Sequence, residues 1–137
     1  MRVFLDANVL FSAAKSSGAV RQFLHKLKSL GHTMVADGYV TSEAGRNLEA
    51  KFPAAMEDFG KVLESVETSA TASKPLGTEV APGLPEKDRP LLAAAIQHRC
   101  QVLLTGDKAH FGPLYGQTLE GVVIHSPASF AATLRTL

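Results

Sequence analysis

Two short apolar runs in this chain each lead to an aspartate. Residues 3–5 precede Asp6, and residues 102–104 precede Asp107 by way of Thr105 and Gly106. Runs of this length are typical of strands buried in a parallel sheet. Because ligands of open α/β sheets bind at the carboxyl ends of the strands, we expect the two carboxylates to meet at one edge. The pair predicts a divalent-cation site, which on a small domain suggests phosphate chemistry.

Each of these aspartates also has a structural alternative. Asp6 could cap a helix that follows the first strand, because aspartate is common at that position. Asp107 follows Gly106, which allows a sharp turn, so its side chain could form an Asx-turn. The position of both residues at strand ends favours the cation site.

Glu43 and Asp88 are further candidate ligands. Glu43 lies within a predicted helix, where a surface ion pair with Arg46 is an alternative role. Asp88 precedes Pro90 near the start of a helix, where it could act as a cap. The same position keeps a carboxylate ionised, as metal ligation requires. Clustered carboxylates repel one another without a divalent cation, and with one they can orient a water for attack on a phosphodiester.

The elements that must position these acids alternate between strand and helix. This alternation predicts one α/β domain over residues 1–137, with a parallel sheet and helices on both faces. Prolines and glycines in 67–85 indicate loops. Predicted strands span residues 3–5, 33–36, 102–104 and 122–124, with a possible edge strand at 66–70; predicted helices span 16–30, 37–51, 53–66, 90–99 and a short segment around 130–134.

Composition narrows the function classes. A chain of 137 residues with one cysteine, Cys100, fits one domain without an internal disulfide or a cysteine-based zinc site. We expect a reducing, cytoplasmic setting and no membrane span, because no apolar stretch approaches bilayer length. The net charge of +1 argues against binding nucleic acid through bulk charge, so a polyanion must be held locally. Of the five histidines, His110 lies closest to a candidate ligand, which makes it a candidate substrate contact.

The chain resembles a PIN domain of the kind found in the toxins of VapBC-type toxin–antitoxin pairs. Four segments carry the resemblance in order, and 123–127 resembles the last strand and turn of the family. The four segments are residues 3–10, 42–48, 84–95 and 104–112.

The resemblance implies a central parallel five-stranded sheet flanked by helices, and a ribonuclease that depends on Mg²⁺ or Mn²⁺. A metal-activated water would cleave the phosphodiester bonds of RNA. The acidic positions of the family map onto Asp6, Glu43, Asp88 and Asp107, which would be both catalytic and metal-binding. Thr105 matches a hydroxyl that supports the first aspartate, and Asn8 matches a residue that shapes the same turn.

The resemblance also implies partners. A toxin of this kind acts on RNA, forms a homodimer and is neutralised by a small antitoxin protein. Candidates for holding the RNA backbone are the cationic residues near the acids together with one histidine. They are Lys15, Arg46, Lys87, Arg89, Lys108 and His110.

Three other functions stay open at this point. A stand-alone PIN nuclease in RNA processing would have the same acids. A phosphatase of the haloacid-dehalogenase type would place a second aspartate where Asn8 stands, and a lysine near the nucleophile. A non-catalytic module that binds metal or phosphate, such as a receiver-like domain, would have adjacent acids near the N-terminus, where residues 2–4 supply none.

Overall fold

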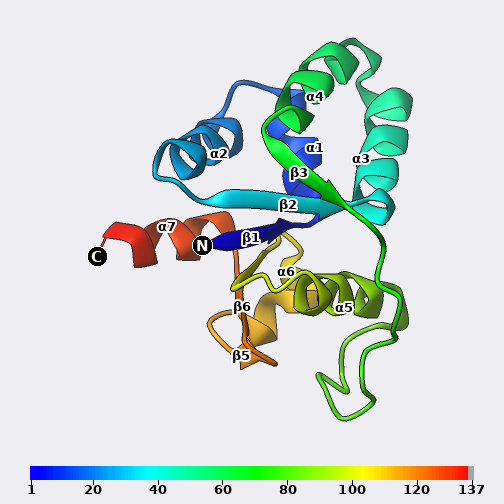
Figure 1. The fold of residues 1–137 in the computed structure, drawn as a ribbon. Coiled ribbons are helices and arrows are strands. Elements are labelled where there is room, and N and C mark those ends of the chain that lie inside the picture. The colour runs from blue at the N-terminus through cyan, green and yellow to red at the C-terminus, as the bar shows by residue number, and fades with distance from the viewer. Residues whose placement is uncertain (136–137) are drawn as a thin grey trace.

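Over the described residues the central sheet has six strands, in the order β3-β2-β1-β4-β6-β5 (Figure 1). A computed structural model describes residues 1–135. All neighbouring strands are parallel except β5 and β6, which are antiparallel. The strands are β1 (Arg2–Leu5), β2 (Thr33–Asp37), β3 (Val66–Ser69), β4 (Val102–Leu104), β5 (Thr118–Leu119) and β6 (Val122–His125).

Helices cover both faces of this sheet. In Figure 1, α1 to α4 lie on one side and α5 and α6 on the other. The α-helices are α1 (Ala7–Lys15), α2 (Ala19–Ser29), α3 (Gly38–Lys51), α4 (Met56–Leu63), α5 (Arg89–Gln97), α6 (Lys108–Phe111) and α7 (Pro127–Arg135). The short 3-10 helices are η1 (Pro53–Ala55), η2 (Glu86–Asp88) and η3 (Gly112–Leu114).

The predicted fold class is confirmed, with one additional strand. Five strands are parallel and flanked by helices, as expected, and 66–70 forms the edge strand β3. The sixth strand, β5, is a two-residue segment paired with β6 through a turn at Glu120 and Gly121, both with positive φ. Two residues are too few to show an alternating pattern, and this turn lacks the usual Asn-Gly or Asp-Gly sequence.

Helix α1 is a second addition, because the predicted helices began only at residue 16. Its inward residues include Val9, Leu10, Ala13 and Ala14, all of which are buried. The helix contacts α2, α3 and α4, so apolar residues occupy more than one of its faces. Such a helix lacks the single apolar stripe by which surface helices are detected.

The order of the strands fixes the place of a binding site. From β1 the chain moves outward through β2 to β3, and it then returns to the other side of β1 as β4. The carboxyl ends of β1 and β4 therefore flank the point at which connections leave in opposite directions, where open α/β sheets bind ligands. Asp6 and Asp107 follow these two strands.

The segment between β3 and η2 contains neither helix nor strand over 70–85, as predicted. It is nevertheless held to the domain by Arg89, whose guanidinium donates to three loop carbonyls. The acceptors are the carbonyls of Gly77, Val80 and Ala81, at 2.8, 3.1 and 2.9 Å. Within residues 1–135, none of the helices is long and apolar enough to cross a membrane.

Candidate active site

The four acids expected to form a site line one pocket at the carboxyl edge of the sheet. The pocket has a volume of about 320 Å³. Asp6 follows β1, Glu43 lies in α3, Asp88 ends η2, and Asp107 precedes α6. The remaining wall consists of Ala7, Asn8, Phe11, Tyr39, Asn47, Lys51, Lys87 and Leu91. Residues separated by as many as 101 positions in the sequence thus share one cavity.

Asp6 is the most enclosed of these acids. Its side chain is held by three donors: the backbone N–H of Ala7 at 2.6 Å, the hydroxyl of Thr105 at 2.7 Å and the amide of Asn8 at 3.2 Å. Burial nevertheless raises the pKa of Asp6 from 3.8 to about 6. The Thr105 and Ala7 hydrogen bonds oppose this shift, and the nearby charges of Glu43 and Asp88 add to it.

Asn8 connects the two strand ends that carry the aspartates. Its Nδ2 donates to Asp6, and its Oδ1 accepts from the backbone N–H of Gly106 at 2.8 Å. A side chain at Gly106 would be crowded, since its Cβ would lie 3.3 Å from Oδ1 of Asn8. The hydrogen bond between Asn8 and Gly106 joins residues 98 positions apart and holds the turn after β4 against the start of α1.

Thr105 orients both aspartates with one hydroxyl. Its Oγ1 donates to Oδ2 of Asp6 at 2.7 Å and accepts from the backbone N–H of Asp107 at 3.0 Å. The residue is fully buried, so water cannot replace either contact. Asp107 in turn begins α6, where its Oδ1 accepts from the backbone N–H of His110 at 3.1 Å.

Valine has nearly the shape of threonine but lacks its hydroxyl. Replacing Thr105 with valine should therefore reduce the metal-dependent cleavage of RNA that the resemblance implies. The substitution removes the donor to Asp6 and leaves the Asp107 N–H unpaired, at a cost of about 1–3 kcal/mol in unfolding free energy. Loss of such an orienting contact lowers metal affinity or turnover by roughly 10–100-fold. Urea unfolding and metal titration measure the two effects. Thr105→Ser should retain most activity, and Thr118→Val on the surface should change neither quantity.

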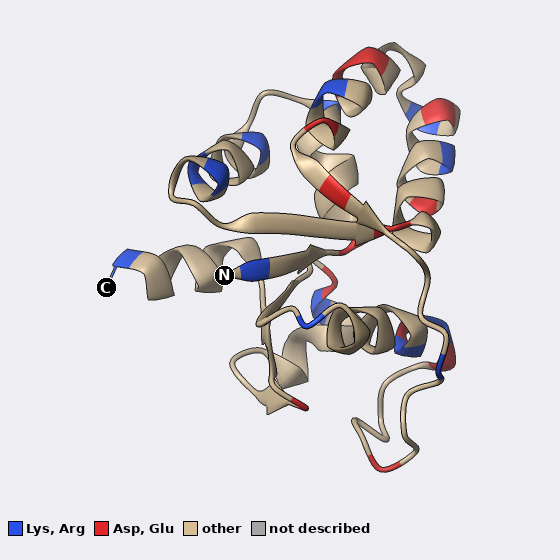
Figure 2. Cartoon of the chain, viewed as in Figure 1, with Lys and Arg blue, Asp and Glu red and all other residues tan. Residues whose placement is uncertain are grey.

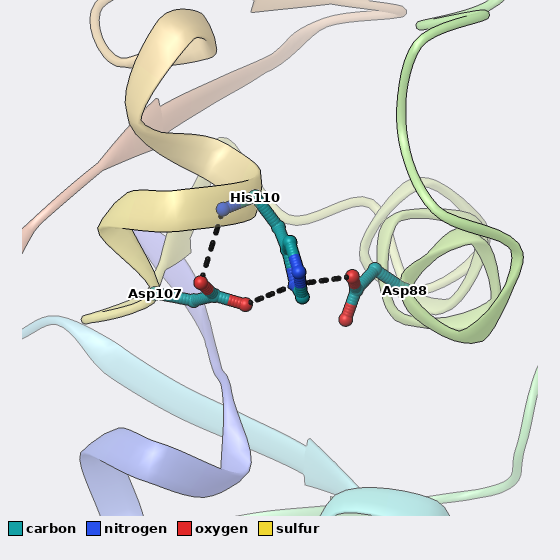
Figure 3. A group of neighbouring side chains, drawn as sticks. All are labelled: Asp88, Asp107 and His110. Atoms are coloured by element: carbon teal, nitrogen blue, oxygen red, sulfur yellow. Dashed lines mark hydrogen bonds and ion pairs between the residues drawn. The ribbon is translucent and has the colours of Figure 1, made fainter.

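A second group joins Asp88 and Asp107 of the pocket wall to His110 (Figure 3). The Nδ1 atom of His110 lies 3.0 Å from Oδ2 of Asp88 and 2.8 Å from Oδ2 of Asp107. Both are ion-pair distances, but neither contact has hydrogen-bond geometry, so Nδ1 of His110 and Oδ2 of Asp88 are buried without a hydrogen bond. Burial raises the pKa of Asp88, and the charge of Asp107 adds to the rise against the opposing effects of His110 and Lys87.

These residues fit a divalent cation. One ligand atom from each of Asp88, Asp107 and His110 lies within 4.8 Å of the others. Carboxylate oxygens suit Mg²⁺ and Mn²⁺, and an imidazole nitrogen adds affinity for transition metals. Without a cation, the folded protein loses free energy to the two buried atoms that lack hydrogen bonds and to the repulsion among the carboxylates. A bound cation would compensate both costs.

The structural alternatives for the four acids divide into two pairs. Asp6 caps α1 through the N–H of Ala7, as its alternative role required, and also lines the pocket. Asp107 also lines the pocket, and it caps α6 through the N–H of His110 rather than forming the Asx-turn considered for it. Asp88 makes no capping hydrogen bond to α5. Within the described residues, no ion pair joins Glu43 to Arg46. The simpler roles proposed for Glu43 and Asp88 are therefore absent.

The cations expected to hold RNA lie in different places. Lys87 lines the pocket, and its carbonyl accepts from the hydroxyl of Tyr39 on α3 at 3.2 Å. Lys15 lies at the end of α1, whereas Arg46 and Lys108 are exposed and do not line the pocket. Arg89 is occupied by the loop carbonyls described above.

Sequence reasoning missed several wall residues, of which Asn47 and Lys51 had a detectable signal. Glu43, Asn47 and Lys51 are spaced four residues apart, which places them on one face of α3. Phe11 had no such signal, because α1 itself was not predicted.

Comparison with solved structures identifies the fold. VapBC2 from Rickettsia felis, solved bound to a DNA fragment from its promoter, has a TM-score of 0.70 at 16% identity and aligns over 92% of this chain and 98% of that one. VapBC-1 from nontypeable Haemophilus influenzae has a TM-score of 0.58 at 11% identity and aligns over 93% of this chain and 99% of that one. VapC20 from Mycobacterium tuberculosis is described as a sarcin-ricin loop cleaving toxin. It has a TM-score of 0.53 at 12% identity and aligns over 85% of this chain and 98% of that one.

These similarities define the class: the chain has a VapC-like PIN-domain fold. No model of a known protein family matches the sequence, and no curated protein sequence matches it. The similarity is therefore one of structure at low sequence identity, and it extends over most of each chain.

Proposed function

We propose that this protein is a metal-dependent endoribonuclease and the toxin of a toxin–antitoxin pair. The observation that carries the proposal is the convergence of Asp6, Glu43, Asp88 and Asp107 on one pocket at the carboxyl edge of the sheet. The VapC-like fold supports it, as does the fit of the pocket to a divalent cation.

In this proposal the four carboxylates hold Mg²⁺ or Mn²⁺, with His110 available as a nitrogen donor. When bound, such a cation activates water and stabilises negative charge on a phosphate. The reaction adds the oxygen of water to phosphorus and breaks the bond to the 3′ oxygen, which leaves as a hydroxyl. Thr105 and Asn8 keep Asp6 in one orientation throughout, because each donates to its Oδ2 atom.

The same proposal covers substrate and partners. Two of the similar structures are VapBC complexes, and VapC20 is described as cleaving the sarcin-ricin loop, which favours RNA as the substrate of this chain. We accordingly propose a small antitoxin partner, a homodimer and a cytoplasmic setting. An adjacent reading frame for a small protein that suppresses growth arrest would support the toxin assignment, and its absence would favour a stand-alone nuclease.

Removal of metal tests the activity directly. Purified protein should cleave RNA in the presence of Mg²⁺ or Mn²⁺, and EDTA should abolish the cleavage because four carboxylates without a cation repel the phosphate. Gel electrophoresis of labelled RNA measures both conditions, and added Mn²⁺ should restore cutting. Cleavage that persists in EDTA, or none with any divalent metal, would contradict the proposal.

A further inference from the structure

Beyond the acids, the pocket extends between α1 and α3. Both helices begin at the carboxyl edge of the sheet and contact each other, and Lys15 at the end of α1 reaches the ring of Phe52 at the end of α3. Lys15 and Lys51 both lie in the last turns of their helices, away from the strand ends that carry the acids. Figure 2 shows basic (blue) and acidic (red) residues interspersed along α3. Eight residues separate Glu43 from Lys51, a rise of about 12 Å.

An aromatic and cationic cluster stands at this far end. The rings of Phe11 and Phe52 meet edge to face with centroids 5.8 Å apart. Nζ of Lys15 lies 5.6 Å from the Phe52 centroid and 5.9 Å from that of Phe11, and Nζ of Lys51 lies 5.9 Å from the Phe11 centroid. We call these four residues the outer aromatic site.

The contacts within the domain leave part of this arrangement exposed to solvent. Phe52 is 44% exposed, although a phenylalanine is normally buried. Neither Lys15 nor Lys51 forms an ion pair with a carboxylate within residues 1–135, although acids are available on neighbouring turns of α3. Exposed cation–π contacts contribute little to stability. An exposed ring next to ammonium groups that form no ion pair is instead a combination that binds unpaired nucleotides.

We propose that the outer aromatic site binds single-stranded RNA a few nucleotides away from the phosphate to be cut. An unpaired base stacks on Phe52, and neighbouring phosphates contact Lys15 and Lys51. This inference rests on the proposed nuclease function, since the occupant is the RNA that enters the acidic pocket. The distance of about 12 Å along α3 corresponds to roughly three stacked nucleotides. A duplex hides the faces of its bases, so the site favours loops and single strands.

Binding of labelled RNA tests the proposal in an Asp6→Asn background, which prevents turnover. Fluorescence anisotropy would compare a short single-stranded RNA with the same strand in a duplex, in Mg²⁺. Phe52→Ala should weaken single-strand binding by roughly 5- to 100-fold, the effect of losing one base stack, and leave duplex binding unchanged. Phe52→Leu, which keeps the apolar contact with Phe11, should behave like alanine, whereas Phe52→Tyr should retain binding.

Two further readouts separate stacking from charge. A 2-aminopurine base in the single strand should lose fluorescence on binding, and this quenching should disappear in Phe52→Ala. Replacing Lys15 and Lys51 with alanine together should lower the slope of log affinity against log salt by roughly 1.4, or 0.7 for each lost phosphate contact. Leu30→Ala is the control for Phe52→Ala, because it also removes an exposed apolar side chain. Lys26→Ala together with Lys28→Ala is the control for the two lysines, and both lie in α2. These controls should leave RNA binding unchanged.

Single-strand binding that is insensitive to Phe52→Ala and Phe52→Leu in folded protein would overturn the proposal. So would an equal loss of duplex binding. Metal-dependent cleavage by the wild type together with any of these results would overturn this inference alone. Absence of cleavage together with stacking on Phe52 would overturn only the nuclease function.

Discussion

Asp6→Asn is expected to abolish metal-dependent RNA cleavage. The substitution keeps the size of the side chain but replaces one carboxylate oxygen with an amide that cannot bind a cation in the same way. Loss of an outer hydrogen-bonding residue in a metal site costs roughly 10–100-fold, so loss of a ligand should cost more than about 100-fold in rate. Initial rates of RNA cleavage at saturating Mn²⁺ measure the effect, and calorimetric titration should show weakened metal binding.

A matched substitution on the surface separates this effect from general damage. Asp58 pairs with Arg21 at 3.2 Å and is about half exposed, so Asp58→Asn should leave cleavage unchanged. In cells, Asp6→Asn should relieve any growth arrest that expression of the wild type causes, and Asp58→Asn should not. Full ribonuclease activity of purified Asp6→Asn, with contamination controlled, would overturn the assignment.

The sequence could predict the places of the acids because those places depend on local patterns. Apolar runs ending near Asp6 and Asp107 mark strand ends, and the switch-point rule brings such ends together. The sequence evidence for a site role of Glu43 and Asp88 is weaker, since a helical glutamate and an acid near a helix start are both common. Only the order of the four segments in the family raised them, and the structure then placed all four acids in one pocket.

The contacts that orient these acids join residues far apart in the sequence. The Asn8–Gly106 hydrogen bond and the Thr105 bond to Asp6 span 98 and 99 residues, and no local pattern indicates them. The closeness of His110 to Asp107 is local, since three residues separate them, but its contact with Asp88 joins residues 22 positions apart that no local pattern relates. Phe52 shows no periodicity, because it follows the last turn of α3 and its ring is positioned by α1.

The same Asp6→Asn substitution should change how the stability of the metal-free protein depends on pH. The folded state raises the pKa of Asp6 from 3.8 to about 6, chiefly by burial, so the folded protein binds this proton more tightly than the unfolded chain. Below pH 3.8 both states hold the proton, and the residue has no pH-dependent effect. As pH rises to 6 and above, the unfolded chain loses the proton more readily, and the wild type loses about 3 kcal/mol of unfolding free energy.

Asparagine does not titrate, so the variant should escape this loss. Its unfolding free energy relative to wild type should rise by about 2 kcal/mol between pH of about 4 and about 7, whatever the fixed cost of the amide. Urea unfolding in EDTA at several pH values measures the difference, and parallel curves for the two proteins would contradict it. Added Mn²⁺ should reverse the order, since metal binds only the folded state and binds the wild type more tightly. The carboxylate that the proposed active site requires is therefore one that destabilises the protein until a cation neutralises it.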